Sequence, residues 1–143
     1  MAGRRMTRVT QRKTKTQWAC FLEEIARQYR GAQRIILVMD NLNTHGPGSL
    51  YETFAPEVAK ALWDRFEFVY TPKHGSWLNM AEIELNVLIK QCLDRRIDNM
   101  IEMQAEVEAW QKRRDNMHST IDWQFRSEDA RIKLKRLYPT LDA

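Results

Sequence analysis

The sequence lacks the features that mark a secreted or membrane-spanning protein. Its 143 residues contain only two cysteines, Cys20 and Cys92, and each lies in a segment with the apolar spacing of an amphipathic helix. No apolar run approaches the length of a membrane span, and no signal peptide opens the chain. We therefore expect a cytoplasmic protein with reduced core cysteines and no membrane partner.

Internal repeats and low-complexity tracts are also missing, and no charge strongly dominates. The net charge of +4 weakly favours a polyanionic partner. Hydrophobic residues make up 43% of the chain, which is enough for a core, and the length limits that core to one domain.

Acidic residues are absent from the first 15 residues, which are strongly basic. The cations there are Arg4, Arg5, Arg8, Arg12, Lys13 and Lys15. A weak alternation over residues 6–10 is compatible with an edge strand. The segment is either a solvated, partly disordered start or an arm or strand that contacts phosphates.

A single apolar stripe predicts the first helix. Apolar residues recur at helical spacing from Trp18 to Tyr29, with Thr16 as a candidate cap and Gly31 as a candidate stop. The residues of this stripe, which we expect to face the core, are Trp18, Phe21, Leu22, Ile25 and Tyr29.

Two short apolar runs predict strands. Residues 35–39 are five consecutive apolar residues, which predict a strand buried on both faces. Residues 66–70 predict a second strand, which Thr71 and Pro72 end. A loop over 41–49 and short helical pieces over 51–63 separate the strands, so the fold class is α/β.

Three more helices are expected after the second strand. The first covers about 81–96, with a buried stripe of Ala81, Leu85, Leu88, Ile89 and Cys92. The next begins near Asn99, which forms a capping-box spacing with Glu102. Its apolar face holds Met103, Val107, Trp110 and Met117, and its basic face holds Lys112, Arg113 and Arg114. Ser127 would cap the last, a short basic helix.

Two acids lie where a metal site is chemically plausible. Asp40 directly follows the first strand, and catalytic residues of α/β folds often occupy that position. Glu82 and Glu84 lie near the start of the helix over 81–96. Carboxylates that converge from such places can hold Mg²⁺ for phosphoryl transfer, although Asp40 alternatively is a turn or helix cap.

A helical wheel predicts that the two glutamates project in different directions. Glu82 projects at the edge of the buried stripe, whereas Glu84 projects toward Gln91 and Arg95. We expect Glu82 to face inward and Glu84 to face solvent. Each acid alternatively is a surface group that stabilises the helix dipole.

Polar residues near these acids each have two interpretations. His45 and His74 either line the metal site, or orient Asp40 and the DNA, or are hydrogen-bonded loop histidines. Asn41 and Asn79 either hold the carboxylates in place or satisfy turn backbone.

Candidate DNA contacts come from basic and aromatic side chains. Lys73 either contacts phosphate or is ordinary surface, and Trp77 either stacks on a base or anchors the core. The other candidates are Arg4, Arg5, Arg8, Arg131 and Lys133.

Two sequence motifs surround the acids. Residues 38–45 read Val-Met-Asp-Asn-Leu-Asn-Thr-His, and residues 70–84 read Tyr-Thr-Pro-Lys-His-Gly-Ser-Trp-Leu-Asn-Met-Ala-Glu-Ile-Glu. They closely resemble the DDE transposases of bacterial insertion sequences, in the branch related to the mariner elements. The resemblance continues through residues 91–96, Trp123 and residues 129–134, and covers nearly the whole chain.

The resemblance implies a ribonuclease H-like catalytic domain, a mixed sheet flanked by helices, that cuts and joins DNA with two metal ions. Asp40 matches the second acid of the family's triad and Glu82 the third. The separation of these two acids is longer than in the mariner branch proper, so Glu84 stays an alternative.

The family's first Asp has no counterpart, because residues 1–39 contain no Asp. The N-terminal helix-turn-helix region is also missing. We therefore expect residues 1–143 to be a partial domain, incomplete at its N-terminal side, from a truncated gene, a second reading frame or a cut piece.

The resemblance implies transposition by metal-dependent cleavage and strand transfer at transposon ends, within an intact transposase. Mg²⁺, or Mn²⁺ in its place, would be the cofactor, and DNA ends and target would be the partners. We expect a homo-oligomer, no small-molecule substrate, and no cleavage by this chain alone. One alternative is a non-catalytic DNA-binding or assembly module derived from a transposase. Another is an unrelated metal-dependent nuclease or phosphatase.

Overall fold

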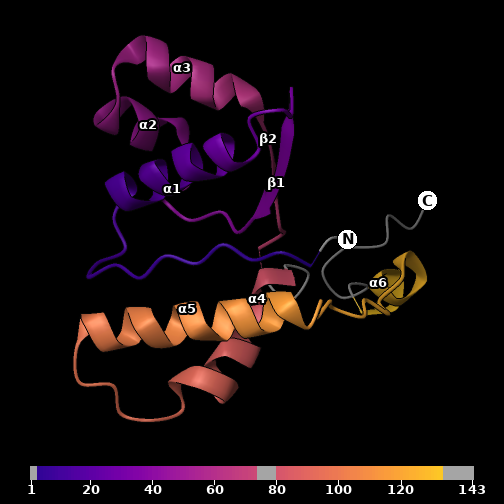
Figure 1. The fold of residues 1–143 in the computed structure, drawn as a ribbon. Helices are drawn as coiled ribbons and strands as arrows, with labels where there is room; N and C mark the ends of the chain where they lie inside the picture. The colour runs from indigo at the N-terminus through magenta and orange to yellow at the C-terminus, as the bar shows by residue number, and fades with distance from the viewer. Residues whose placement is uncertain (1–2, 74–79, 134–143) are drawn as a thin grey trace.

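The computed structural model describes residues 3–73 and 80–133 (Figure 1). The elements of the first part are α1 (Lys15–Gln28), β1 (Ile35–Met39), α2 (Pro47–Thr53), α3 (Pro56–Arg65) and β2 (Phe66–Tyr70). Those of the second part are α4 (Met80–Leu88), the π-helix η2 (Ile89–Leu93), α5 (Met100–Asn116) and α6 (Ser127–Lys133). We call residues 15–70 the strand half, and α4, η2 and α5 the helical half.

The two strands confirm both strand predictions. β1 and β2 pair in parallel, with Ile35 opposite Phe66 and Met39 opposite Tyr70. Their carboxyl ends therefore lie at the same edge of the sheet, which faces the helical half (Figure 1). The described residues form only this two-stranded parallel sheet, which is compatible with a ribonuclease H-like domain but is not the full mixed sheet.

Helices α1, α2 and α3 cover one face of the sheet (Figure 1). Leu22, Leu50 and Phe66 lie in the core between them, and Trp63 stacks on Phe68 with ring centroids 4.2 Å apart. α1 begins after Thr14, whose hydroxyl accepts from the amide of Gln17, and not after Thr16. Tyr29 is the C-cap of α1 and is exposed, so the predicted stripe is one turn too long.

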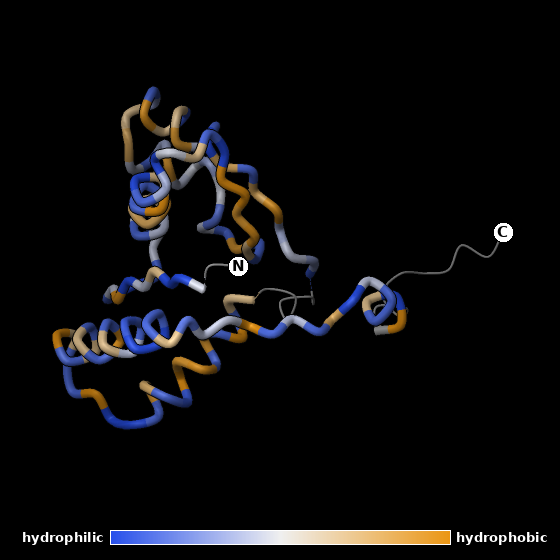
Figure 2. The backbone as a smooth tube through the Cα atoms, turned by 45° about the vertical axis from the view of Figure 1, so that its right-hand side comes forward, coloured by the Kyte–Doolittle hydropathy of each residue, from blue (hydrophilic) through white to orange (hydrophobic). Residues whose placement is uncertain are grey.

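No element of the described part covers the other face of the sheet, and β1 is not buried on both faces as predicted. Ile36 is 65% exposed and Val38 is 51% exposed, and their neighbour Val69 in β2 is exposed as well. Orange segments mark these apolar strands in Figure 2. The apolar composition of a strand does not by itself show which elements pack against its two faces.

Arg65 joins the end of α3 to the end of α1. Its guanidinium donates to the carbonyls of Ala26, Tyr29 and Ala32 at 3.1, 2.8 and 2.9 Å. These carbonyls lie at or beyond the last turn of α1, where the helix has no further amides to offer. Arg65 thus caps α1 with a positive charge.

The helical half has a small core of its own. Cys92, Val107 and Trp110 are buried there, and Val9, Val87 and Leu88 pack against them. Burial raises the pKa of the Cys92 thiol, as expected for a reduced core cysteine, whereas Cys20 is half-buried.

The helix predicted over residues 81–96 is interrupted by the wider π turn of η2. A π turn adds a residue to the turn and rotates the residues after it, so the α-helical stripe does not hold. Ile89, the first residue of the π turn, is exposed, while Cys92 is buried. Leu85, which lies before the π turn, is exposed as well, contrary to prediction.

Asn99 caps α5 as predicted, since its side chain accepts from the amide of Glu102 at 2.8 Å. Glu102 accepts from the amide of Asp98, not of Asn99, at 3.4 Å. Met117 lies just past the end of α5 and is exposed, contrary to prediction.

Residues 3–10 run extended between the two halves and form no strand (Figures 1 and 2). Val9 packs on the helical core, and Gln111 of α5 donates to the carbonyl of Arg5 at 2.8 Å. Residues 3–10 of the basic start are therefore bound to the protein and do not form a free arm.

Candidate metal and nucleic-acid site

Asp40 follows β1 at the sheet edge that faces the helical half, and it contacts His45. The Nδ1 atom of His45 lies 2.8 Å from the Asp40 carbonyl oxygen and 3.1 Å from its Oδ1. A backbone carbonyl can only accept a hydrogen bond, so Nδ1 carries the proton. Among the proposed roles of His45, the contact favours orienting Asp40.

Other side chains hold the His45 ring and loop in place. Trp18 of α1 stacks on the ring with centroids 5.4 Å apart, and the imidazole is only 12% exposed. The hydroxyl of Tyr70, the last residue of β2, donates to the His45 carbonyl at 3.0 Å. Buried Ser49, in the first turn of α2, donates to the Thr44 carbonyl of this loop at 2.6 Å. The position of His45 is thus determined by both strands and by α1.

A cavity of about 500 Å³ lies between the two halves beside His45. Trp18 and Phe21 line it from the strand half, and Leu88 and Val107 line it from the helical half. The hydroxyl of Thr44, also in the lining, is buried and has no hydrogen-bond partner among residues 3–73 and 80–133.

Glu84 does not face solvent, which corrects the sequence-based expectation. Its side chain is 19% exposed and binds two arginines. Nε and Nη2 of Arg5 donate to its two oxygens at 2.8 and 3.0 Å, and Arg114 of α5 also binds both. The Arg5 hydrogen bond is the largest cause that holds the pKa of Glu84 below its usual value, while partial burial opposes it.

Glu82 differs from Glu84, because no partner for it lies in the described part of the chain. It lies in the first turn of α4, is half-buried, and makes no hydrogen bond or ion pair within the described residues. Both oxygens of Glu84 are already occupied by guanidinium groups. The surroundings therefore favour Glu82 over Glu84 as the acid that is free to bind a metal.

The donor chemistry fits a hard cation, but the described donors are few. Mg²⁺ prefers carboxylate oxygens and retains several waters, and Asp40 and Glu82 supply such oxygens. Within residues 3–73 and 80–133, no group of three acidic, histidine or cysteine side chains converges on a common point. The convergence of Asp40 and Glu82 stays a prediction.

The remaining candidate residues fall into two groups. Asn41 and Lys73 are exposed, as surface or DNA contacts would be. His74, Trp77 and Asn79 lie outside the described residues.

The basic candidates differ in how far they are available to DNA. Arg5 is 10% exposed and also binds Asp115, so its assignment as a phosphate contact is corrected. Arg8 pairs with Glu24 at 3.6 Å, and Arg4 and Arg131 are exposed. The side chain of Lys133 lies outside the description.

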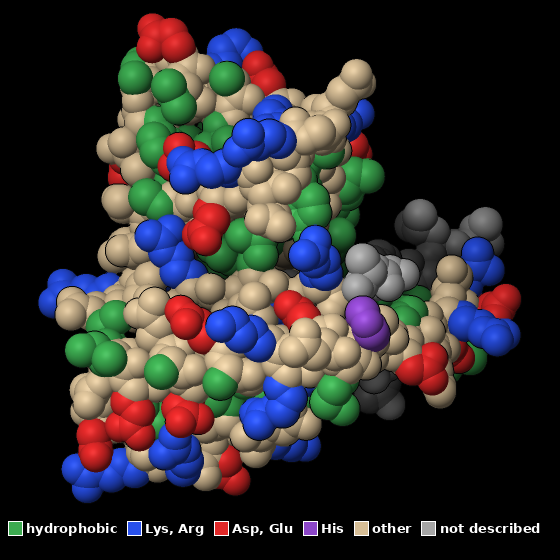
Figure 3. Space-filling view, in the orientation of Figure 1, with side chains coloured by type: hydrophobic (Ala, Val, Ile, Leu, Met, Phe, Trp, Pro, Cys, Tyr) green, Lys and Arg blue, Asp and Glu red, His purple; other side chains and the backbone are tan. Residues whose placement is uncertain are grey.

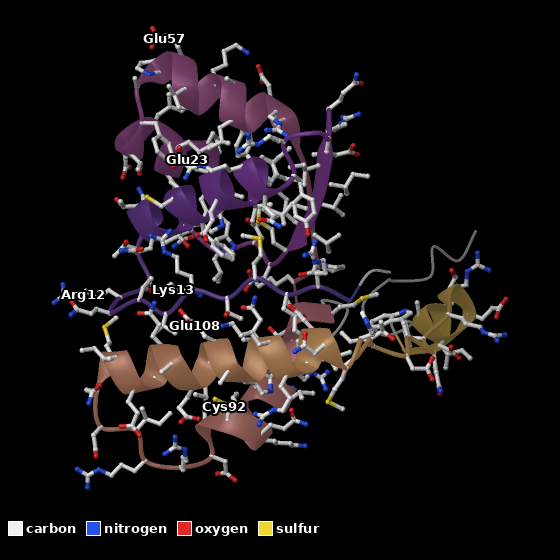
Figure 4. All side chains as sticks on the ribbon, viewed as in Figure 1. Arg12, Lys13, Glu23, Glu57, Cys92 and Glu108 are labelled. Atoms are coloured by element: carbon white, nitrogen blue, oxygen red, sulfur yellow. The ribbon has the colours of Figure 1, made fainter. Side chains whose placement is uncertain are left out.

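Arg12 and Lys13 project from the bend before α1 (Figure 4). Neither has an ion-pair partner among the residues with a described placement. On the face in Figure 3, Lys and Arg side chains lie interspersed with Asp and Glu over both halves. The basic surface on this face is therefore scattered.

The stack of Trp18 on His45 and the clamp around Glu84 could not be predicted from the sequence. Trp18 fits an ordinary core stripe, and Arg5 and Arg114 are far from Glu84 in the chain. No local sequence pattern could have indicated either contact.

Comparison with known proteins identifies a family. Residues 1–104 match the family model described as DDE superfamily endonuclease. No curated protein and no solved structure matches the chain. None of the helices in the described part is long and apolar enough to cross a membrane.

Proposed function

This chain belongs to the DDE superfamily endonuclease family, and we propose that it acts in DNA transposition as part of a transposase. Family membership supports a transposase-type nuclease with DNA as its substrate. The motifs around Asp40 and Glu82 support the finer assignment to the mariner-related insertion-sequence branch. The observation that carries the proposal is Asp40, held by His45 at the carboxyl end of β1.

Asp40 and Glu82 would hold the divalent metal that this superfamily generally uses, Mg²⁺ or Mn²⁺. Such metals stabilise the attacking and leaving oxygens of a phosphodiester. His45 fixes the Asp40 carboxylate through Oδ1, which leaves Oδ2 available as a ligand. Trp18 restricts the imidazole, so the acid is oriented before a metal arrives.

We further propose that the chain alone does not cleave DNA. Residues 1–39 contain no Asp, and Glu23 and Glu24 lie on α1, whose apolar face is committed to the core. A two-metal site with two acids lacks the charge that bridges the ions. The third acid would come from outside residues 1–143, and we expect the active form to be oligomeric.

A non-catalytic DNA-binding or assembly module is the second candidate. The exposed cations Arg4, Arg12, Lys13 and Arg131 favour it, because they need no metal site to bind phosphates. Metal dependence separates the two functions.

The test measures Mn²⁺ affinity by electron paramagnetic resonance of the free ion. We expect binding that Asp40→Asn and Glu82→Gln each weaken, whereas the exposed control Asp98→Asn has no effect. If neither substitution changes the Mn²⁺ affinity, the proposed metal site is contradicted and the non-catalytic module is favoured.

A nicking assay on supercoiled DNA tests the inactivity of the chain alone. We expect no cleavage with Mg²⁺ or Mn²⁺. Robust cleavage that Asp40→Ala abolishes would show that the third ligand is already present. The proposal that the site is incomplete would then be wrong.

A further inference from the structure

Helix α4 carries the proposed metal ligand Glu82, yet none of its residues is buried. Ile83 and Leu85 are exposed, and only Val87 and Leu88, at its C-terminal end, pack on the helical core. Apolar packing therefore anchors one end of the helix. The direction of its first turn, where Glu82 lies, therefore depends on further contacts.

The ion cluster around Glu84 provides that second attachment. Arg5 binds Glu84 in a two-pronged geometry, which fixes the orientation of the carboxylate as well as its position. Arg114 reaches the same carboxylate from α5. The three side chains are 10–19% exposed, so solvent screens the cluster only weakly.

Both arginines are themselves held in place. Arg5 also donates to Asp115 at 3.1 Å and to the carbonyls of Gly3 and Ser119 at 2.7 and 2.6 Å. The Arg114 guanidinium lies 5.9 Å from the ring centroid of buried Trp110. Glu84 is thus attached to residues 3–10 and to the C-terminal half of α5.

The attachment constrains Glu82 through helix geometry. Residues two apart on an α-helix differ by roughly 200° about its axis. Glu82 therefore projects to the side of α4 away from the arginines. The cluster is also electrically balanced, because Glu84 and Asp115 offset Arg5 and Arg114. The two cations are held where they do not compete with a metal for Glu82.

We propose that Glu84, clamped by Arg5 and Arg114, is a positioning residue that sets the rotation of α4 and thereby the direction of Glu82. The inference rests on the proposed function insofar as Glu82 binds a metal. Arg114 lies beyond the residues that match the family, so the clamp uses a part of the chain outside that match.

Two readouts test the clamp on the 143-residue chain. Amide residual dipolar couplings report the orientation of residues 80–88 relative to α5 without metal. Mn²⁺ affinity reports whether the Glu82 side chain is oriented to bind the metal. The variants are Glu84→Gln and Arg114→Gln, with Arg114→Lys as a milder form if folding fails. The control Arg27→Gln removes a charge from an exposed pair with Glu23.

In the variants, we expect that the alignment tensor fitted to α5 no longer describes the couplings of residues 80–88. In Arg27→Gln, the same tensor should still describe both helices. Mn²⁺ affinity should fall by about 10-fold or more, the size of effect seen when a group that orients a metal ligand is removed. Couplings that still fit would overturn the clamp. Altered couplings with unchanged Asp40-dependent Mn²⁺ affinity would overturn the positioning role. If the wild-type chain shows no Asp40-dependent binding, the proposed function fails, and the couplings alone decide whether α4 is clamped.

Discussion

At the scale of single residues, the contact between His45 and Asp40 is the most informative one. A loop histidine becomes an orienting group because Trp18 and Tyr70 hold it from two different elements. The carboxylate keeps one oxygen outside this contact. Orientation before binding lowers the cost of ordering a ligand when the metal arrives.

His45→Phe separates the stack from the hydrogen bond. Phenylalanine can keep the ring contact with Trp18 but cannot donate to Asp40. We expect Mn²⁺ affinity to fall by about 10-fold with little change in unfolding free energy. Isothermal titration measures the first and urea unfolding the second. Unchanged affinity would mean that His45 is only a loop residue.

Glu84 gives the chain a predicted dependence of stability on pH. Its pKa is lower in the folded state than in the unfolded state, first because of the Arg5 hydrogen bond. Its stabilising contribution is therefore present above the unfolded pKa and is lost as pH falls through the folded pKa. At about pH 7, Glu84→Gln should cost roughly 2 kcal/mol, less than a fully buried pair because some solvent remains.

Urea unfolding of wild type and Glu84→Gln from neutral to acidic pH measures this effect. The difference in unfolding free energy should shrink toward zero below the folded pKa. A difference that stays constant with pH would show that packing, and not the carboxylate charge, accounts for the loss.

At the scale of elements, charged side chains connect pieces that apolar packing leaves loose. α3 and α1 share a core, and Arg65 adds a charged contact by donating to three carbonyls at and beyond the end of α1. α4 has no buried residue and depends on Glu84. The π turn of η2 then redirects the chain so that Cys92 enters the helical core.

Arg65→Lys tests the cap of α1. Lysine keeps the charge but loses the planar fork that reaches three carbonyls. Since hydrogen bonds to charged groups are worth about 1.5–3 kcal/mol, we expect a loss of roughly 2 kcal/mol in unfolding free energy. Chemical denaturation measures it, with Arg34→Lys in the exposed Glu67 pair as the matched control. Equal effects of the two changes would rule out a special role for Arg65.

At the scale of the whole molecule, two small cores face each other across residues 3–10. The net charge of +4 is spread over both halves, and several of its cations form ion pairs within the protein. DNA binding, if electrostatic, therefore relies on the exposed residues Arg4, Arg12, Lys13 and Arg131.

We predict weakly sequence-dependent DNA binding that falls steeply with salt, because neutralised phosphates release counterions. Fluorescence anisotropy of a random duplex between about 50 and 200 mM salt measures the slope. The double change Arg12→Gln with Lys13→Gln should reduce the slope by about 1–2. Lys60→Gln, a cation on α3 paired with Asp64, is the control. Salt-insensitive binding would contradict the prediction.

The sequence by itself determined the elements whose signals are local. β1 and β2 follow from short apolar runs, and the cap at Asn99 follows from side-chain chemistry within one turn. The family and its candidate acids Asp40 and Glu82 were also readable, because they lie in continuous motifs.

Only the tertiary structure decided which of these residues are free. Glu84 appeared exposed on a helical wheel, yet it binds Arg5 and Arg114, which come from distant parts of the chain. Ile36 and Val38 appeared buried, yet no described element covers them. Exposure and charge pairing depend on which distant segments meet. A local pattern carries no information about such contacts, because they arise only when the packed halves bring those segments together.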